Sequence, residues 1–195
     1  MPRYISSGTC IYKDKDFRFL VMDRYETDLQ RILEKQNNRL TSEIGILCIM
    51  RQILYALEYI HQRGYAHADI KGANLMLKSD NQAYLVDFGL AYRFKRDNIH
   101  QKYDAKPDRR HNGTIEYTSR DAHDGARNQI LVDQIFSFNL FMILFHFKET
   151  SRRSDLEILG YCIIHWTCGI LPWIGLIKNP VQVQLSKKEY IFYIL

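Results

Sequence analysis

Three absences narrow the function of this chain before any motif is considered. The sequence has only 4 cysteines among its 195 residues and no Cys-x-x-Cys pair, which argues against a disulfide framework or a zinc site. It has no run of about 18 uninterrupted apolar residues, so a transmembrane helix is not expected. Its N-terminus lacks the basic-then-apolar order of a secretory signal. Free thiols in a reducing intracellular compartment are the simplest account of these absences.

The composition is that of a globular protein. Apolar residues make up 46% of the chain and charged residues 25%, which is typical of a folded domain rather than a disordered segment. A length of 195 residues suits one domain with a sizeable core. The net charge of +5 permits acidic partners but is too small to argue for them. Sequence-specific binding of nucleic acid is not expected.

The stretch 67–74, His-Ala-Asp-Ile-Lys-Gly-Ala-Asn, contains residue types that phosphoryl transfer requires. That reaction needs a carboxylate that orients the attacking hydroxyl and accepts its proton, ligands that hold magnesium on the phosphates, and a cation near the moving charge. Asp69 has the first of these properties and Lys71 has the third. Asn74 on the same loop and Asp87, 18 residues after Asp69, can hold the metal.

The spacing of two motifs makes this signal specific. A lone His-x-Asp would be weak, because a capped turn with a satisfied histidine explains it as well. Here Asp87-Phe-Gly89 follows the loop. Between the motifs, Leu75–Lys78 and Ala83–Val86 flank a polar turn, a pattern that predicts two short strands. The complete set is far more specific than either motif alone.

Apolar periodicity predicts a strand and two helices ahead of the 67–74 loop. Residues 17–22, Phe-Arg-Phe-Leu-Val-Met, indicate a strand, and Asp28 can cap a short helix. A longer helix begins after Thr41 or Ser42 and stops at Gly64. Its apolar positions at helical spacing are Leu47, Met50, Ile53, Leu54, Leu57 and Ile60. This helix leads directly into the loop and should fix its position.

The C-terminal half is less regular. Residues 92–127 carry nine Lys or Arg against six Asp or Glu and are interpreted mainly as a solvated loop. Residues 135–147 are strongly apolar but too short to span a bilayer. A buried helix, a membrane-surface segment and a β-prone tract all fit them. Residues 151–166 predict a helix, and the tail beyond Asn179 is polar until the last six residues.

Four segments together resemble the vaccinia-related kinases, a branch of the casein kinase group of serine/threonine protein kinases. They are His67-Ala-Asp-Ile-Lys-Gly-Ala-Asn-Leu-Met-Leu77, Tyr84-Leu-Val-Asp-Phe-Gly-Leu-Ala-Tyr-Arg93, Gly113-Thr-Ile-Glu-Tyr-Thr-Ser119 with Asp121-Ala-His123, and Ser151-Arg-Arg-Ser-Asp-Leu-Glu-Ile-Leu-Gly-Tyr-Cys162. The resemblance implies an α+β, protein-kinase-like fold, mostly the helical large lobe plus the last small-lobe strands and the hinge. Residues 1–25 would be a remnant of the small lobe and hinge. Residues 26–195 would be the large lobe, with an atypical apolar insert at 127–149.

The resemblance also implies roles for single residues. Asp69 would accept the proton, Lys71 would contact phosphate, and Thr114 would link the floor for the substrate peptide to Asp69. Asn74 and Asp87 would hold magnesium. Asp155 would hold the backbone of the 67–74 loop from the helix below. The residues implied beside the adenine of ATP are the gatekeeper Met22, the hinge residues Asp23, Arg24 and Tyr25, and Met76 under the ring.

Some positions depart from the family pattern. The sequence has no Gly-x-Gly-x-x-Gly over the phosphates, and Lys13 and Lys15 lie in a turn-like run that cannot replace the family's strand lysine. We therefore expect an N-terminally truncated gene model or splice form, with residues 127–149 as intron read as protein. Ala68 stands where many kinases have arginine, so the resemblance implies that activation-loop phosphorylation is not needed.

Three functions follow as hypotheses. The first is a serine/threonine protein kinase that transfers the γ-phosphate of ATP, with Mg²⁺, to protein hydroxyls. The second is a catalytically impaired kinase fragment that acts as a binding or scaffold module, because the glycine loop and strand lysine are missing. The third is a small-molecule phosphotransferase, which the peptide floor at 113–119 argues against. Family analogy suggests protein substrates, some of them chromatin-associated, in the nucleus or cytoplasm.

Overall fold

Helix α2 (Glu43–Gln62) leads into the 67–74 loop, as the sequence predicts. The computed structural model describes residues 1–195 except 41, 79–81, 98, 101–110, 125–152 and 195. Ser42 caps the helix, since its Oγ accepts a hydrogen bond from the backbone N–H of Gly45 at 3.1 Å. After the helix, Gly64 has a φ of +79°, and a Cβ there would lie 2.9 Å from the carbonyl oxygen of Lys95. Glycine at this position is therefore required for the turn that ends the helix.

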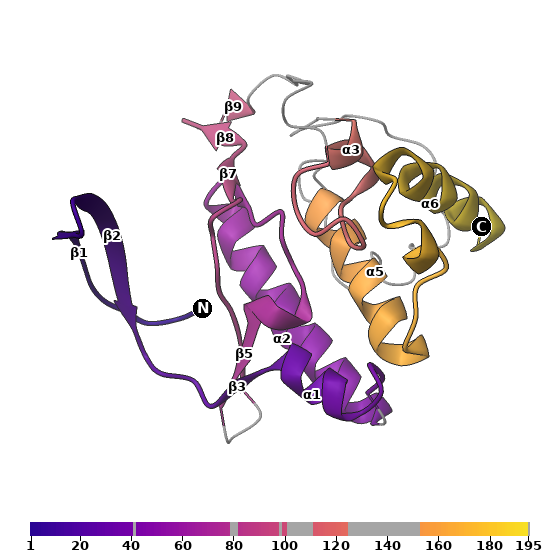
Figure 1. The fold of residues 1–195 in the computed structure, drawn as a ribbon, viewed down its shortest axis with the longest axis horizontal. Coiled ribbons are helices and arrows are strands. Elements are labelled where there is room, and N and C mark those ends of the chain that lie inside the picture. The colour runs from indigo at the N-terminus through magenta and orange to yellow at the C-terminus, as the bar shows by residue number, and fades with distance from the viewer. Residues whose placement is uncertain (41, 79–81, 98, 101–110, 125–152, 195) are drawn as a thin grey trace.

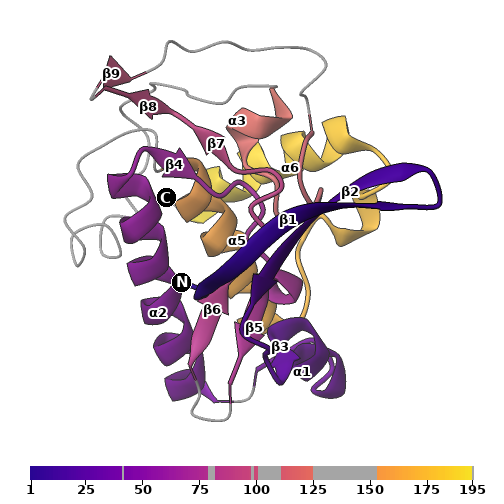
Figure 2. The same ribbon diagram turned by 90° about the vertical axis from the view of Figure 1, so that its left-hand side faces the viewer.

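A three-stranded antiparallel sheet lies against α2, and the 67–74 loop runs from α2 into this sheet (Figure 2). Its strands are β3 (Thr27–Asp28), β5 (Leu75–Leu77) and β6 (Ala83–Leu85), in the order β3-β5-β6. The last two confirm the predicted short strands. The short helix η1 (Gly72–Asn74) ends the loop and runs directly into β5.

Helix α1 (Leu29–Lys35) follows β3 and packs against η1 and β5. Its N-cap is Asp28, as predicted, whose carboxylate accepts a hydrogen bond from the backbone N–H of Arg31 at 3.0 Å. A second small sheet joins β4 (Tyr65–Ala66) to β7 (Tyr92–Arg93). The chain between β4 and β7 contains both motifs. Its two ends are held together by the pairing of these strands.

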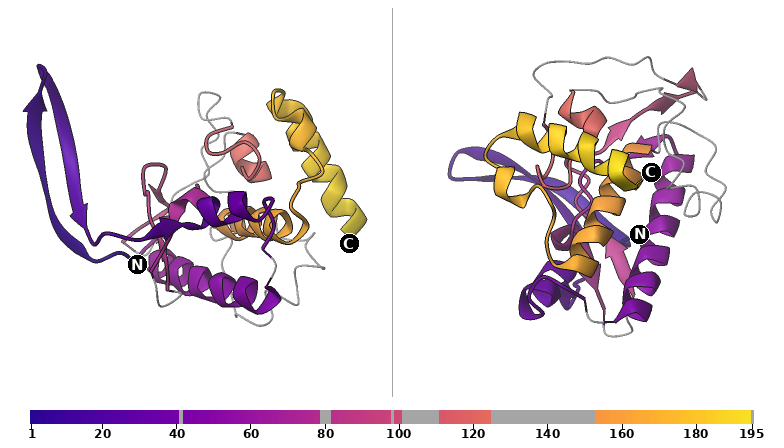
Figure 3. Two further views of the ribbon diagram at one scale, coloured as in Figure 1. Left: turned by 60° about the horizontal axis from the view of Figure 1, so that its bottom comes forward. Right: turned by 90° about the vertical axis from the view of Figure 1, so that its right-hand side faces the viewer.

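The N-terminal hairpin stands away from the helices (Figures 1 and 3). Strands β1 (Tyr4–Tyr12) and β2 (Lys15–Met22) pair antiparallel around a turn at Lys13 and Asp14, both with positive φ. The predicted strand at 17–22 is confirmed, and β1 was not predicted. The alternation of polar and apolar residues along β1 is weak, so this strand is recognised only from its pairing with β2.

The charged segment that was interpreted as a loop contains several short elements. They are β7, the paired strands β8 (Lys95–Arg96) and β9 (Ile99–His100), and the short helix α3 (Arg120–His123). The apolar segment at 127–149 lies outside the described residues, so its alternative interpretations stay open.

Two longer helices form the C-terminal part. Helix α5 (Arg153–Cys168) corresponds to the predicted helix at 151–166. Helix η4 (Ile174–Leu176) and helix α6 (Pro180–Ile194) follow, and α6 packs against α3 (Figure 1). The sequence analysis did not find α6, because its residues are mixed in polarity around the helix. In the described part of the chain, no helix is both long enough and apolar enough to cross a membrane.

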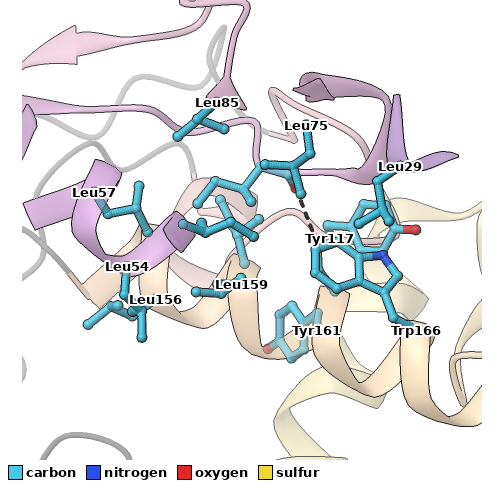
Figure 4. Packing of buried hydrophobic residues seen from close by; sticks show 14 of the residues in the cluster. Leu29, Leu54, Leu57, Leu75, Leu85, Tyr117, Leu156, Leu159, Tyr161 and Trp166 are labelled. Atoms are coloured by element: carbon cyan, nitrogen blue, oxygen red, sulfur yellow. Dashed lines mark hydrogen bonds between the residues drawn. The ribbon is translucent and has the colours of Figure 1, made fainter. Parts of the chain in front are cut away.

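The hydrophobic core lies between α2, the strands β5 and β6, and α5 (Figure 4). Leu54 and Leu57 of α2 lie beside Leu156 and Leu159 of α5, and all four are at most 3% exposed. Burial of one leucine side chain is worth about 1.5–3 kcal/mol, so these contacts hold α5 against α2. One predicted core position is wrong: Leu47 is 58% exposed, whereas the adjacent Ile46 is only 6% exposed, so the first turn of α2 faces the core through Ile46. Together these elements form the predicted α+β fold.

Candidate active site

The buried carboxylate of Asp155 on α5 holds the start of the 67–74 loop. It accepts hydrogen bonds from the backbone N–H of His67 at 2.8 Å and of Ala68 at 2.8 Å. His61 Nε2, in the last turn of α2, lies 2.7 Å from the same carboxylate. Burial raises the pKa of Asp155, but the bonds from His61 and His67 outweigh it and hold the pKa below its ordinary value. Ala68 has a φ of +68°, a conformation that a non-glycine residue keeps only when its surroundings enforce it.

The carboxylate of Asp69 is the centre of the site. Lys71 Nζ lies 2.8 Å from its Oδ2, and the hydroxyl of Thr114 donates to its Oδ1 at 2.9 Å. Asn74 Nδ2 donates to Oδ2 at 3.1 Å and to the backbone oxygen of Asp69 at 2.8 Å. Burial raises the pKa of Asp69, but the bonds from Lys71, Thr114 and Asn74 together hold it below its ordinary value. The group is therefore an ionised carboxylate at neutral pH, able to accept a hydrogen bond.

Thr114 links the 67–74 loop to a second segment of chain. Its hydroxyl donates to Asp69 and accepts from Lys71 Nζ at 2.9 Å. Because Lys71 also contacts Asp69, each of the three side chains contacts the other two, and we call this arrangement a closed set. Gly113 precedes it with a φ of +101°, and a Cβ there would lie 3.3 Å from the carbonyl oxygen of Ala68. The φ of Gly113 is one that L side chains rarely adopt, and the close approach of the two segments adds to the strain, so glycine is strongly favoured at this position.

Asn74 and Asp87 are brought close through the backbone rather than through their side chains. The N–H of Val86, just before Asp87, donates to the carbonyl oxygen of Asn74 at 3.0 Å, and His67 Nε2 lies 3.0 Å from the carbonyl oxygen of Val86. Asp87 is exposed, has a φ of +62°, and accepts a bond from the N–H of Gly89 at 3.1 Å.

These two side chains fit a magnesium ion. Magnesium prefers oxygen ligands and takes one or two protein ligands together with substrate phosphates and water. Asn74 uses its Nδ2 in the bonds to Asp69, which leaves its amide oxygen free to act as a ligand. The carboxylate of Asp87 faces solvent. The described residues contain no group of three or more His, Cys, Asp or Glu side chains placed to bind a metal by themselves.

The predicted adenine contacts follow β2 and reach the sheet. Met22 ends β2 and is half-buried, and Asp23 makes ion pairs with Arg3 at 3.0 Å and with Lys78 at 3.7 Å. Tyr25 packs on Tyr84 of β6, with ring centroids 4.9 Å apart.

The remaining two differ in exposure. Met76 on β5 pairs with Asp28 of β3 and is half-buried, and Arg24 is exposed. The structure therefore joins Tyr25 and Met76 through one small sheet, while Arg24 stands apart from it.

The sequence analysis missed two residues that support this site. His61 holds Asp155, and Trp173 Nε1 donates to the carbonyl oxygen of Glu116 at 2.8 Å, within the segment that carries Thr114. The sequence feature that could have indicated His61 is its place directly after Ile60, which belongs to the apolar face of α2. The signal for Trp173 was a buried indole N–H, which requires an acceptor.

The comparisons with known proteins agree with this geometry. A family model described as "protein kinase domain" matches residues 3–143. Human serine/threonine-protein kinase VRK2 is 41% identical over 189 residues, which are 96% of this chain and 32% of that protein. A probable serine/threonine-protein kinase of fowlpox virus, FPV212, is 35% identical over 98% of this chain and 55% of its own length. Nucleosomal histone kinase 1 of Drosophila melanogaster is 38% identical over 97% of this chain and 28% of its own length.

The chain therefore belongs to the protein kinase family. Within that family its branch is the vaccinia-related kinases, to which the four motifs and these relatives point. The chain spans from 28% to 55% of the length of the three relatives named above.

Proposed function

We propose that this chain provides the catalytic and substrate-binding part of a serine/threonine protein kinase that uses ATP and Mg²⁺. The observation that carries this proposal is the closed set formed by Asp69, Lys71 and Thr114. In it, the carboxylate of Asp69 contacts both the cation of Lys71 and the hydroxyl of Thr114, which belongs to the 113–119 segment. A small-molecule phosphotransferase would not need the second segment, because a small substrate requires no peptide floor.

In this proposal the hydroxyl of a protein Ser or Thr attacks the γ-phosphorus of ATP. The hydroxyl proton passes to the carboxylate of Asp69, the new P–O bond forms, and the bond to the ADP oxygen breaks. Lys71 stabilises the negative charge on the transferring phosphoryl group. Asn74 and Asp87 would hold magnesium, which neutralises charge on the phosphates when bound.

The residues after β2 would bind the nucleotide. Met22, Asp23, Arg24 and Tyr25 would lie beside the adenine ring, with Met76 beneath it. Support for Tyr25 and Met76 comes from Tyr84, whose ring packs on Tyr25 and which pairs with Met76 in the sheet. The ion pairs of Asp23 with Arg3 and Lys78 hold its side chain aside, which leaves the backbone of this segment as the contact for adenine.

We infer that the substrates are proteins, including proteins of chromatin, and that the protein works in the nucleus or cytoplasm. One relative carries the name nucleosomal histone kinase, and the mildly basic charge of +5 is compatible with acidic assemblies.

The test is transfer of labelled phosphate from ATP with magnesium to a basic protein substrate. The variant Asp69→Asn removes the proton acceptor while keeping the shape of the side chain, and we expect the transfer to fall by at least about a hundredfold, as for loss of a general base. Asp16→Asn, on the exposed strand β2, is the matched control and should transfer at the wild-type rate. A folded chain that binds the substrate but transfers no phosphate would instead support the binding-module hypothesis.

A further inference from the structure

Lys187 on α6 is completely buried, which is unusual for a lysine. Its exposed fraction is 0%, and it is among the largest fully buried side chains of the described residues. Within the described part of the chain it forms no ion pair with a carboxylate. A buried amine without such a pair must be stabilised by hydrogen bonds and by polarisable neighbours.

Backbone carbonyl groups provide those hydrogen bonds. Lys187 Nζ donates to the carbonyl oxygen of Ile115 at 2.9 Å and to that of Thr118 at 2.7 Å. Its third neighbour is His123 Nε2 on α3, at 3.3 Å. The amine group therefore joins α6 to both ends of the turn 115–118 and to α3.

Two aromatic rings cover the amine on its other side. Nζ lies 5.0 Å from the ring centre of Tyr161 on α5 and 5.3 Å from that of Trp173. Burial lowers the pKa of Lys187 to about 7, against the opposing charges of Glu157 and Glu116. In either protonation state the amine keeps at least two N–H groups, enough for both carbonyl oxygens.

The turn held by Lys187 starts at the residue that meets Asp69. The N–H groups of Tyr117 and Thr118 donate to the carbonyl oxygen of Thr114 at 2.8 and 2.9 Å, and Thr114 contacts Asp69 through its hydroxyl. Trp173 holds the carbonyl oxygen of Glu116 between them. The position of Thr114 thus depends on a turn whose outward carbonyl groups are fixed from the C-terminal part of the chain.

We propose that Lys187 is a positioning residue, whose buried amine fixes the carbonyl groups of Ile115 and Thr118 so that Thr114 meets the carboxylate of Asp69. The consequence for catalysis rests on the proposed function. The consequence for the turn does not, because it concerns the backbone alone. Lys187 does not contact Asp69 in the described structure, so it acts through the 114–118 turn.

The test compares the full chain with Lys187→Met and with the control Lys188→Met. Methionine keeps an unbranched apolar side chain of similar length but has no donor. Lys188 is the next residue on α6 and is exposed. Hydrogen–deuterium exchange is measured at the N–H groups of Tyr117 and Thr118, and at residues 53–60 of α2 as an internal reference.

We expect exchange at Tyr117 and Thr118 to be at least about tenfold faster in Lys187→Met, with α2 and the Lys188→Met protein unchanged. The phosphate-transfer assay then gives a second readout. The KM for the protein substrate should rise by about fivefold or more, while the KM for ATP stays at the wild-type value. If the wild type transfers no phosphate, the proposed function fails, and the exchange measurement still decides the role of Lys187.

Three results would overturn the proposal. The first is unchanged exchange at Tyr117 and Thr118 in Lys187→Met. The second is faster exchange that extends equally to α2, which would make the amine a general stabiliser. If Lys187→Met does not fold, Lys187→Gln is measured in the same way: it keeps an N–H donor on a shorter side chain, so exchange at Tyr117 and Thr118 should still be faster than in the wild type while α2 is unchanged, and wild-type exchange at both sites would count as the first result. Loss of the α2 fold in that variant too would be the third result against a local positioning role.

Discussion

Replacement of Asp155 by asparagine tests how the 67–74 loop is held. The Asp155 carboxylate is 0% exposed and receives bonds of 2.7–2.8 Å from His61, His67 and Ala68. Asparagine keeps one oxygen but turns an NH₂ group toward at least one of these donors. Each buried donor left without an acceptor costs about 1–3 kcal/mol, and a hydrogen bond to a charged group is worth about 1.5–3 kcal/mol. We therefore expect Asp155→Asn to lower the free energy of unfolding by about 3 kcal/mol.

The assay is urea unfolding at pH 7, followed by circular dichroism and extrapolated linearly to water. Asp16→Asn on the exposed strand β2 is the control and should change the free energy by less than about 0.5 kcal/mol. A natural domain has only about 5–15 kcal/mol in total, so the loss in Asp155→Asn should be plain. A loss below about 0.5 kcal/mol in Asp155→Asn would refute the conclusion that this carboxylate holds the loop.

The same pair of proteins predicts a pH dependence. The pKa of Asp155 lies below its ordinary value in the folded chain. As the pH falls, the unfolded chain therefore takes up a proton at Asp155 at a higher pH than the folded chain does. The stabilisation is complete above the unfolded pKa of about 4 and is lost as the pH falls through the folded pKa. The wild-type and Asp155→Asn stabilities should therefore converge below pH of about 4. If the plots of stability against pH for the two proteins stay parallel down to acid unfolding, the conclusion that Asp155 accepts these bonds as an ionised carboxylate is wrong.

Three further changes test the neighbouring groups. Gly113→Ala places a Cβ 3.3 Å from the carbonyl oxygen of Ala68 at a φ of +101°; we expect a loss of about 1–3 kcal/mol in the free energy of unfolding, measured in urea, together with slower phosphate transfer. Thr114→Val keeps the shape of the side chain but removes the hydroxyl that donates to Asp69; phosphate transfer should fall by about tenfold to a hundredfold, with the free energy of unfolding changed by less than about 1.5 kcal/mol. Burial raises the pKa of Asp121 to about 6, so the folded chain binds more protons than the unfolded chain between pH of about 4 and 6, and stability falls as the pH rises through that window. Asp121→Asn should remove this fall and be more stable than wild type at pH 7 by about 2 kcal/mol.

Controls for these variants are available in the same chain. Gly175→Ala, where a Cβ would meet nothing within 4 Å, controls for the added methyl group. Thr9→Val on the exposed strand β1 controls for loss of a threonine hydroxyl. An unchanged rate in Thr114→Val would count against the bond to Asp69 as part of the site. An unchanged slope of stability against pH in Asp121→Asn would count against its raised pKa.

Local signals in the sequence determined the elements close to the site. Ser42 and Gly64 set the ends of α2, and Asp28 set the start of α1, because caps and turns act through hydrogen bonds within a few residues. The motif at 67–74 identified Lys71 and Asn74, which contact Asp69. Each of these features depends on near neighbours in the chain, so the sequence alone was enough to find them.

Only the tertiary structure decided how distant segments meet. The α6 helix has no clear apolar face in the sequence, and the burial of Lys187 on it depends on Tyr161, Trp173 and the carbonyl groups of 115–118. The contact of Asp155 with the N–H groups of His67 and Ala68 spans 88 and 87 residues. A buried charge is tolerated only where folding supplies its partners, and the identity of those partners is fixed by packing between elements that no local pattern of residues records.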